Sequence, residues 1–313
     1  MKILLTYDYG DENRKLIENL GYEVLYIHES EILNNDLTND CNILICYNPF
    51  GKLDISKMPK LKLIVLSSIG FDQLPFEKLE DRNILVTNNQ GGYSIPMGEW
   101  IVMNILEIFK KSKKRYNMQN AKKWKIDTSI LEIYNKKILF LGTGTIAKEG
   151  AKRLVGFSSE IYGANRSGKT SEYFDKVYKL IDIYDHLDEF DIVISTLPHT
   201  HETEHAINAE FLKNMKYKSA LINVSRGKII DELALINCLS NDKLLGVALD
   251  VFNEEPLSET SPLWDYENVY ISSHNSWISE MRNERRFNYI INNLRLLKEG
   301  KKLKNEVNIK RGY

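Results

Sequence analysis

Three polar segments in the second half of the chain carry residue types suited to acid–base chemistry on a small acid. LINVSRGKIIDE contains Arg226, GVALDVFNEEP contains Asp250, Glu254 and Glu255, and NVYISSHNSW contains His274. An arginine can bind a carboxylate and polarise a neighbouring carbonyl, and a histidine can give a proton to the carbonyl oxygen. A carboxylate beside the histidine favours its protonated form. This set predicts reduction of the carbonyl of a small acid.

Each of these side chains also has a purely structural interpretation. His274 alone is a histidine at a strand end, Arg226 alone a surface ion-pair partner, and Glu255 alone a loop carboxylate before Pro256. Most histidines take no part in catalysis. The combination favours chemistry, because ligands of open α/β sheets bind beyond the carboxyl ends of the strands, where these segments are expected to converge.

A dinucleotide-binding loop is predicted upstream of these segments. The apolar run KKILFL leads directly into GTGTIA at residues 142–147, and a helical pattern follows. This is G-x-G-x-x-A between a strand and a helix, the context that gives the motif its meaning. The glycines allow a tight turn and a close approach to the pyrophosphate, and free N–H groups at the helix start bind it. A strand–turn–helix without a ligand is the alternative. The predicted cofactor contacts are Gly142, Gly144, Thr145 and Ile146.

The choice between NADH and NADPH is expected at the end of the next strand, about twenty residues on, where NAD enzymes usually carry a carboxylate. Here Asn165 occupies that place, followed by Arg166, Ser167 and Lys169. Two cations and a hydroxyl can hold a 2′-phosphate, whereas no carboxylate is present to hold the ribose hydroxyls. The alternative is a solvated basic turn. These four residues are predicted to contact the cofactor, and the pattern favours NADPH over NADH.

These motifs resemble the D-isomer-specific 2-hydroxyacid dehydrogenase family, which includes glyoxylate/hydroxypyruvate reductases and phosphoglycerate dehydrogenases. The resemblance covers nearly the whole chain and is most specific in NVSRGKIIDE and ALDVFNEEP. It implies that Arg226 binds the substrate carboxylate and carbonyl, that His274 donates the proton while the cofactor gives its hydride, and that Glu255 supports His274. It also implies that Asp250 holds the nicotinamide carboxamide.

The same resemblance implies further contacts and one departure. LSSIGFDQ resembles the family's substrate loop, which places the backbone around Ile69 and Gly70 at the substrate carboxylate. The family usually has Pro-His before a glycine-rich turn, whereas here Ser273-His274 precedes Asn-Ser-Trp, which leaves the substrate and the role of Trp277 open. The resemblance places the LP pair, Leu197 and Pro198, at the edge of the cofactor site, and it places Thr203 at the start of a helix. The further cofactor contacts are Leu197, Pro198, Thr203, Val224, Asp250 and His274.

Alternating apolar runs and amphipathic stretches must position these residues, and they predict parallel sheets covered by helices. The expected fold is α/β with two domains, a Rossmann dinucleotide-binding domain inserted into a flavodoxin-like substrate domain. Residues 1–93 form the first part of the substrate-binding domain, 94–279 the dinucleotide-binding domain, and 280–313 a C-terminal helix that returns to the substrate domain. A long helix is expected from Met97 to about Lys114, with Met103 on its buried face.

Composition excludes several other classes. The 313 residues are 43% apolar and 27% charged, with a formal net charge of −1, which argues against a nucleic-acid partner. No apolar run approaches the length of a membrane span, and MKILLTYDYGDE predicts a first strand and no signal peptide. Cys41, Cys46 and Cys238 lack metal or redox spacing and are expected to be reduced thiols, which favours a cytoplasmic location.

Two local clusters invite other interpretations. His199, His201 and His205 lie within seven residues, but no carboxylate or thiolate set completes a metal shell, so we expect no metal. The basic run KKSKKRYNMQNAKKWK is interpreted as a solvated helix end and loop. Its aromatic residues Tyr116 and Trp124 are expected at a subunit contact, and the resemblance implies a homodimer built through the cofactor domain.

Three functions remain open from the sequence. The first is an NAD(P)-dependent enzyme that interconverts a small 2-oxo acid and its D-2-hydroxy acid. The second is a biosynthetic phosphoglycerate dehydrogenase that uses NAD, for which a carboxylate is expected at the position of Asn165. The third is a non-catalytic dinucleotide-sensing protein, because the family also resembles the C-terminal-binding corepressors. Catalytic turnover separates the third from the other two.

Overall fold

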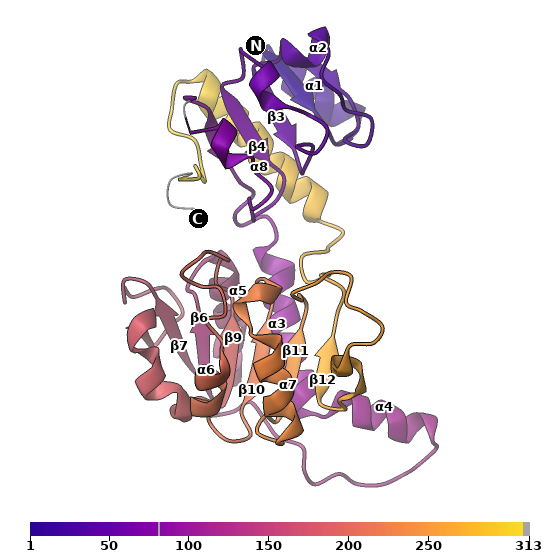
Figure 1. Cartoon of the computed structure of the whole chain (residues 1–313), viewed down its shortest axis with the longest axis vertical. Coiled ribbons are helices and arrows are strands. Elements are labelled where there is room, and N and C mark those ends of the chain that lie inside the picture. Colours follow the sequence, from indigo (N-terminus) through magenta and orange to yellow (C-terminus); the bar gives the residue numbers. More distant parts are fainter. Residues whose placement is uncertain (81, 309–313) are drawn as a thin grey trace. The chain divides into compact units, whose positions relative to one another are not determined.

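The structure is a computed structural model that describes residues 1–80 and 82–308, and the chain divides into two compact units (Figure 1). Unit 1 consists of Met1–Tyr93 and Ser279–Tyr313, and unit 2 of Ser94–Ile278. The sequence of unit 2 is thus inserted into that of unit 1. The substrate-binding and cofactor-binding roles of the two units stay predictions.

Unit 1 contains a five-stranded parallel sheet in the order β2-β1-β3-β4-β5, which is the flavodoxin-like order. The strands are β1 (Lys2–Leu5), β2 (Glu23–Tyr26), β3 (Ile43–Cys46), β4 (Leu63–Leu66) and β5 (Leu85–Thr87). The helices are α1 (Asp11–Asn19), α2 (Asp36–Asn39) and α8 (Arg282–Lys298), with short 3₁₀ turns η1 (Ile55–Lys57) and η2 (Phe76–Lys78).

Both faces of the unit 1 sheet are covered, because successive side chains of a strand point to opposite faces. Ile3 and Leu5 of β1 pack with α1 and α8, whereas Leu4 packs on the opposite side with side chains of η1, η2 and the neighbouring loops. The α8 side chains in this core are Phe287, Ile290, Ile291 and Leu294. The last helix therefore completes the core of the first sheet.

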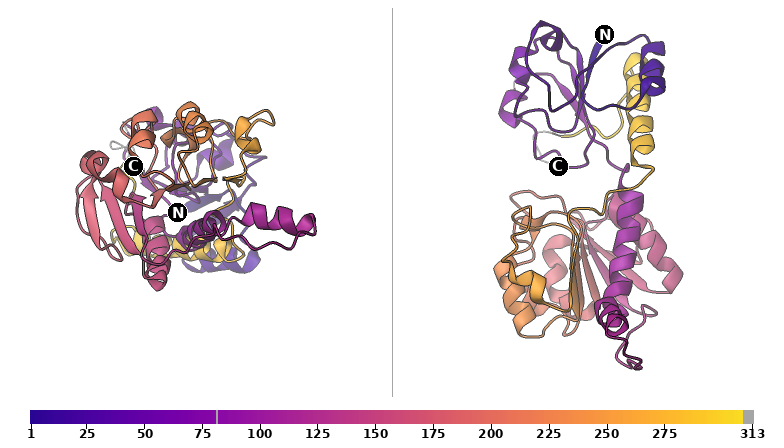
Figure 2. Two further views of the ribbon diagram at one scale, coloured as in Figure 1. Left: turned by 90° about the horizontal axis from the view of Figure 1, so that it is seen from below. Right: turned by 90° about the vertical axis from the view of Figure 1, so that its right-hand side faces the viewer.

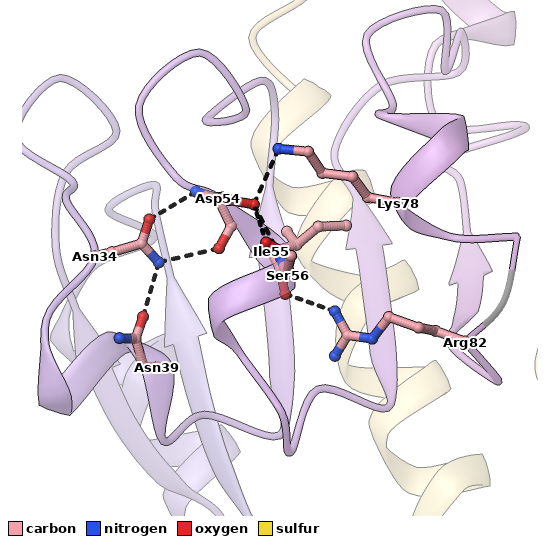
Figure 3. Close-up of polar contacts among 7 residues, drawn as sticks. All are labelled: Asn34, Asn39, Asp54, Ile55, Ser56, Lys78 and Arg82. Carbon is pink, nitrogen blue, oxygen red and sulfur yellow. Dashed lines mark hydrogen bonds and ion pairs between the residues drawn. The ribbon is translucent and has the colours of Figure 1, made fainter.

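A polar network joins three loops of unit 1 (Figure 3). Asn34 accepts a hydrogen bond from the backbone N–H of Asp54 at 2.7 Å and donates one back to its carbonyl at 3.0 Å. The Asp54 carboxylate accepts from Ser56 Oγ at 2.7 Å and Lys78 Nζ at 3.0 Å. Arg82 donates to the carbonyl of the intervening residue, Ile55, at 2.6 Å. These hydrogen bonds hold the three loops together.

Unit 2 contains a seven-stranded parallel sheet in the order β12-β11-β10-β9-β6-β7-β8. The strands are β6 (Lys137–Leu141), β7 (Glu160–Asn165), β8 (Lys176–Lys179), β9 (Ile192–Ser195), β10 (Ala220–Asn223), β11 (Gly246–Leu249) and β12 (Val269–Ile271). The helices are α3 (Ser94–Phe109), α4 (Ser112–Asn120), α5 (Thr145–Leu154), α6 (Ala209–Asn214) and α7 (Glu232–Ser240), with 3₁₀ segments η3 (Val155–Phe157), η4 (Leu180–Glu189), η5 (Gly227–Ile229) and η6 (Pro262–Asp265).

The order of the unit 2 strands is that of a Rossmann fold with one added strand. Helices cover both faces, with α3 along one face and α7 on the other (Figure 2). The strand order reverses between β6 and β9, and dinucleotides bind outside the carboxyl ends of the strands at such a reversal. The expected α/β fold, with a Rossmann domain inserted into a flavodoxin-like domain, is confirmed.

Three predicted details are wrong or incomplete. The expected helix from Met97 to Lys114 is two helices, because Lys111 adopts a left-handed conformation (φ 50°) and the following residues of α4 offer little apolar surface to bury. Met103 is exposed and not on a buried face. Strand β8 was not predicted, since its short sequence KVYK has no strong apolar pattern and it pairs only at the edge of the sheet.

Candidate active site

The predicted phosphate loop joins β6 to α5. Gly142 has φ 94°, a conformation that favours glycine, and a Cβ on it would press against Thr196 Oγ1 at 2.8 Å. Gly144 has open space around its Cα, and no side chain caps the first N–H groups of α5. Ala147, in the first turn of α5, is fully buried. The backbone of Thr145 and Ile146 therefore begins a helix whose N–H groups can donate hydrogen bonds to an anion.

The turn after β7 carries the predicted cofactor-selecting residues. Asn165 uses its side chain to build this turn, because Oδ1 accepts from Ser167 N at 3.1 Å and Nδ2 donates to the carbonyl of Lys169 at 3.0 Å. The same Nδ2 donates to Thr143 Oγ1 in the phosphate loop at 2.9 Å. Arg166 is mostly exposed and lies 3.9 Å from Glu202. Asn165 thus links the basic turn to the phosphate loop.

A buried polar network shapes the loop that carries Arg226. Asn223 Oδ1 accepts from Ser225 Oγ at 2.7 Å, and Asn223 Nδ2 donates to the carbonyl of Arg226 at 3.0 Å. Ser225 Oγ also contacts Ser195 Oγ of β9 at 2.9 Å. Asn223 and Ser195 are completely buried. These bonds fix the backbone from which the Arg226 side chain extends.

Gly227 brings the Arg226 loop against the loop that follows β11. A Cβ at this position would overlap the carbonyl group of Phe252 and the backbone nitrogen of Asn253. Only glycine allows two backbones to approach this closely. The close contact fixes the Arg226 loop relative to the segment that carries Glu255.

His274 and Glu255 form the hydrogen-bonded pair that the sequence predicts. His274 Nδ1 lies 2.9 Å from Glu255 Oε2, and Glu255 Oε1 accepts from the backbone N–H of Phe252 at 3.0 Å. The His274 side chain is 42% exposed and that of Glu255 38% exposed, so the pair is open to solvent or a ligand. Since Glu255 occupies Nδ1, the atom left for proton exchange is Nε2.

Asp250 is buried at the end of β11 and contacts the His274 loop. Its carboxylate accepts hydrogen bonds from Ser272, Asn275 and Ser276. The sequence predicted a cofactor contact for Asp250 and gave no sign of these bonds, because their donors include two backbone N–H groups.

The other predicted cofactor residues of unit 2 follow β9 and β10. Leu197 and Val224 are buried and Pro198 is exposed. Thr203 does not begin a helix as predicted: it lies in a turn, where its hydroxyl accepts from Thr200 N at 2.8 Å and donates to the Pro198 carbonyl, and α6 begins at Ala209 after the cap Asn208. Within the described ranges, no three potential metal ligands cluster, His199, His201 and His205 included.

In unit 1, the predicted substrate loop follows β4. Asn88 Nδ2 donates to the carbonyl of Ile69 at 2.7 Å, and Ser68 Oγ donates to that of Gly70 at 2.6 Å. Gln73 Nε2 donates to Ser68 Oγ at 2.8 Å. The carbonyl groups are thereby paired within unit 1, and the loop has a defined backbone.

The base of this loop is held by residues that the sequence analysis missed. Tyr93 donates a hydrogen bond to the carbonyl of Ser67 at 2.5 Å, and buried Arg286 of α8 donates to the Tyr93 hydroxyl. Tyr9 contacts Ser67 Oγ at 3.3 Å, and burial raises the pKa of Tyr9 to about 12 against the lowering effect of Arg286 and Ser67. No local signal could reveal this cluster, because Tyr93 and Arg286 lie 193 residues apart.

Comparison with known proteins places this arrangement in a family. Residues 102–276 match the model of the D-isomer specific 2-hydroxyacid dehydrogenase, NAD binding domain. The chain belongs to the D-isomer specific 2-hydroxyacid dehydrogenase family. This dehydrogenase is similar to a glyoxylate reductase of Korarchaeum cryptofilum (28% identity over 86% of this chain and 83% of the relative). It is also similar to a glyoxylate reductase of Thermofilum pendens (30% identity over 79% of this chain and 77% of the relative).

A solved structure shows the same fold. The D-isomer specific 2-hydroxyacid dehydrogenase of Xanthobacter autotrophicus Py2, crystallised in complex with NADPH and MES, superimposes with a TM-score of 0.85 at 24% identity, over 100% of this chain and 99% of that one. The protein described here is thus an NAD(P)-dependent dehydrogenase that interconverts 2-oxo and 2-hydroxy acids. Its described helices include none that is long and apolar enough to cross a membrane.

Proposed function

We propose that this dehydrogenase reduces a small 2-oxo acid to the D-2-hydroxy acid, with NADPH as the preferred cofactor. The observation that carries the proposal is the His274–Glu255 pair, at 2.9 Å, in which Glu255 belongs to the loop that packs on Gly227 of the Arg226 loop. Arg226 follows β10 and His274 follows β12, the two strands on either side of β11. A cation and an oriented proton donor at the same edge of the sheet are what reduction of an acid's carbonyl requires.

In the proposed mechanism, bound NADPH supplies a hydride to the carbonyl carbon of the substrate. Arg226 binds the substrate carboxylate and polarises the carbonyl. His274 gives the proton from Nε2 to the carbonyl oxygen, and Glu255 holds the opposite nitrogen and stabilises the protonated imidazole before transfer. The neutral His274 left after transfer regains a proton from solvent, which balances the reaction.

The residues around the phosphate loop fit a dinucleotide. The space beside Gly144 and the uncapped start of α5 suit the pyrophosphate. The exposed turn of Arg166, Ser167 and Lys169 suits a 2′-phosphate. We further propose that Leu197, Pro198, Thr203, Val224 and Asp250 line the nicotinamide side.

The proposal also covers the identity of the substrate, the loop of unit 1 that binds it, and the location of the protein in the cell. The names of the relatives make glyoxylate and hydroxypyruvate the first substrates to test. In unit 1, the backbone N–H groups around Ile69 and Gly70 are proposed to bind the substrate carboxylate. The cysteines are free thiols, two of them fully buried, which fits the proposed cytoplasmic location.

The test is nicotinamide absorbance during turnover with NADPH or NADH and a panel of 2-oxo acids. The panel contains glyoxylate, hydroxypyruvate, pyruvate, phenylpyruvate and branched 2-oxo acids. We expect NADPH-dependent turnover that falls by at least about a hundredfold in His274→Ala, the usual contribution of a positioned proton donor. His186→Ala, in η4, is the matched control and keeps full activity. Tight NADPH binding without turnover on any acid would contradict the proposal.

A further inference from the structure

We propose that Asp250 is the positioning residue of His274, and that its buried carboxylate holds the loop from which His274 acts. This inference rests on the proposed function, in which His274 gives the proton. It adds a second role to the proposed contact with the nicotinamide side, and this role is argued from the hydrogen bonds of Asp250 to the protein itself.

The bonds of Asp250 lie on both sides of His274 in the sequence. Oδ1 accepts from Ser272 Oγ at 2.6 Å and from the backbone N–H of Asn275 at 2.8 Å, and Oδ2 accepts from that of Ser276 at 3.0 Å. The backbone carbonyl of Asp250 accepts from the N–H of His274 itself at 2.8 Å. One residue therefore fixes the path of the loop before, at and after the proton donor.

The conformation of His274 explains why such a constraint is needed. His274 has φ 53°, a left-handed conformation that costs a residue with a Cβ free energy and persists where the surroundings impose it. From this backbone the imidazole reaches Glu255 at 2.9 Å. Asp250 thus sets the backbone of the proton donor, while Glu255 sets the orientation of its ring.

The carboxyl oxygens of Asp250 find their partners in these hydrogen bonds. Its side chain is only 1% exposed, and none of the ion pairs between described residues includes it. A buried carboxylate without a counter-ion is stabilised by hydrogen bonds that donors direct at it. A carboxylate has about four acceptor positions, of which the loop uses three.

Asp250→Asn is the discriminating substitution. An amide has the same size but only one acceptor oxygen, so either Ser276 N–H or the Ser272 and Asn275 donors would face an NH₂ group. We expect kcat to fall about tenfold or more, with the KM for the 2-oxo acid within about threefold of wild type, because coupled neighbours interact by amounts of this order. In a His274→Ala background the same substitution has little further effect on kcat, since Asp250 acts through His274.

Hydrogen exchange of the peptide 272–277 gives a readout that does not require turnover. We expect its amides to exchange faster in Asp250→Asn, while the strands β6 and β9 keep their protection. The matched control is Asp231→Asn at the cap of α7, where Asp231 accepts from Ala234 N at 3.1 Å and an amide can still accept. Ser272→Ala removes one bond only, so a smaller loss of kcat in the same direction tests the proposal even if Asp250→Asn does not fold.

The outcomes separate this inference from the proposed function. Full kcat in Asp250→Asn and Ser272→Ala, or losses from Asp250→Asn and His274→Ala that multiply independently, would overturn the positioning role and leave the reaction intact. A wild type that reduces no acid in the panel would contradict the proposed function. In that case the exchange measurement decides by itself whether Asp250 holds the loop.

Discussion

At the scale of single residues, we propose that Asn165 contributes to cofactor choice through the turn that its side chain builds. Its amide is used within the turn and toward the phosphate loop, so Arg166 and Lys169 are presented on a defined backbone. A carboxylate at this position would repel a 2′-phosphate, whereas a neutral amide does not.

We expect Arg166→Ala to raise the KM for NADPH about tenfold and to leave the KM for NADH nearly unchanged. The reason is that a charge-assisted hydrogen bond to a phosphate contributes about 1.5–3 kcal/mol. Steady-state kinetics with both cofactors measure the effect, and Lys213→Ala on the exposed end of α6 is the control. Glu202→Gln, which removes the carboxylate 3.9 Å from Arg166, is expected to lower the KM for NADPH. Equal changes for both cofactors would count against the basic turn as the 2′-phosphate site.

Substitution of two glycines of unit 2 by alanine is expected to have opposite effects on stability and on cofactor binding. Gly227→Ala is expected to lower the free energy of unfolding by about 3 kcal/mol, because its Cβ would overlap the Phe252 backbone. Gly144→Ala has space for its methyl group and is expected to leave unfolding unchanged while weakening dinucleotide binding. Urea denaturation and cofactor titration of both variants check this pair. A Gly227→Ala protein of normal stability would show that the two loops can separate freely.

At the scale of elements, the network around Asp54 in unit 1 predicts a dependence of stability on pH. Hydrogen bonds from Ser56 and then from Lys78 lower the pKa of Asp54 to about 2. The folded state therefore favours the ionised carboxylate, and this stabilisation is complete above the unfolded pKa of about 3.9. It is lost as the pH falls from there through about 2.

We expect Asp54→Asn to lower the urea midpoint at pH 7 and to approach the wild-type midpoint as the pH falls from about 4 through about 2, where the carboxylate of the folded wild type becomes protonated. Urea titrations between pH 7 and about pH 2 measure the difference. Asp36→Asn, an exposed aspartate outside the network, is the control. A difference from wild type that stays constant across this range would mean that Asp54 does not stabilise unit 1 through its charge.

The elements also show what the sequence can predict. The strand before GTGTIA, the helix after it, and the strands that precede Arg226, Asp250 and His274 were predictable, because apolar runs and turn residues mark them. Strand β8 was missed because its sequence, KVYK, carries no such run. The helix break at Lys111 was missed because a lysine can adopt the left-handed conformation, so no glycine marks the position. The bonds of Asp250 and Arg286 join distant segments through backbone groups and tyrosines, for which a single sequence has no periodic signal.

At the scale of the whole molecule, exposed apolar side chains in the segment after α4 lead us to expect self-association. Trp124 is fully exposed and Ile126 is 83% exposed. Large apolar side chains gathered on a surface mark interaction sites, and the partner we propose is a second copy of this chain. We expect a mass near twice 36.4 kDa by light scattering, and a monomer for Trp124→Glu. Ile181→Glu, at an isolated exposed residue, is the control. A monomeric wild type would contradict the proposed homodimer.

The insertion of unit 2 into unit 1 has a consequence for biosynthesis. A ribosome releases all of Ser94–Ile278 before α8, so the Rossmann sheet can close while the first sheet still lacks its last helix. During that interval Ile3, Ile43 and Leu63, which α8 helps to cover in the finished protein, face the solvent or a chaperone. The unit translated first is therefore the one completed last.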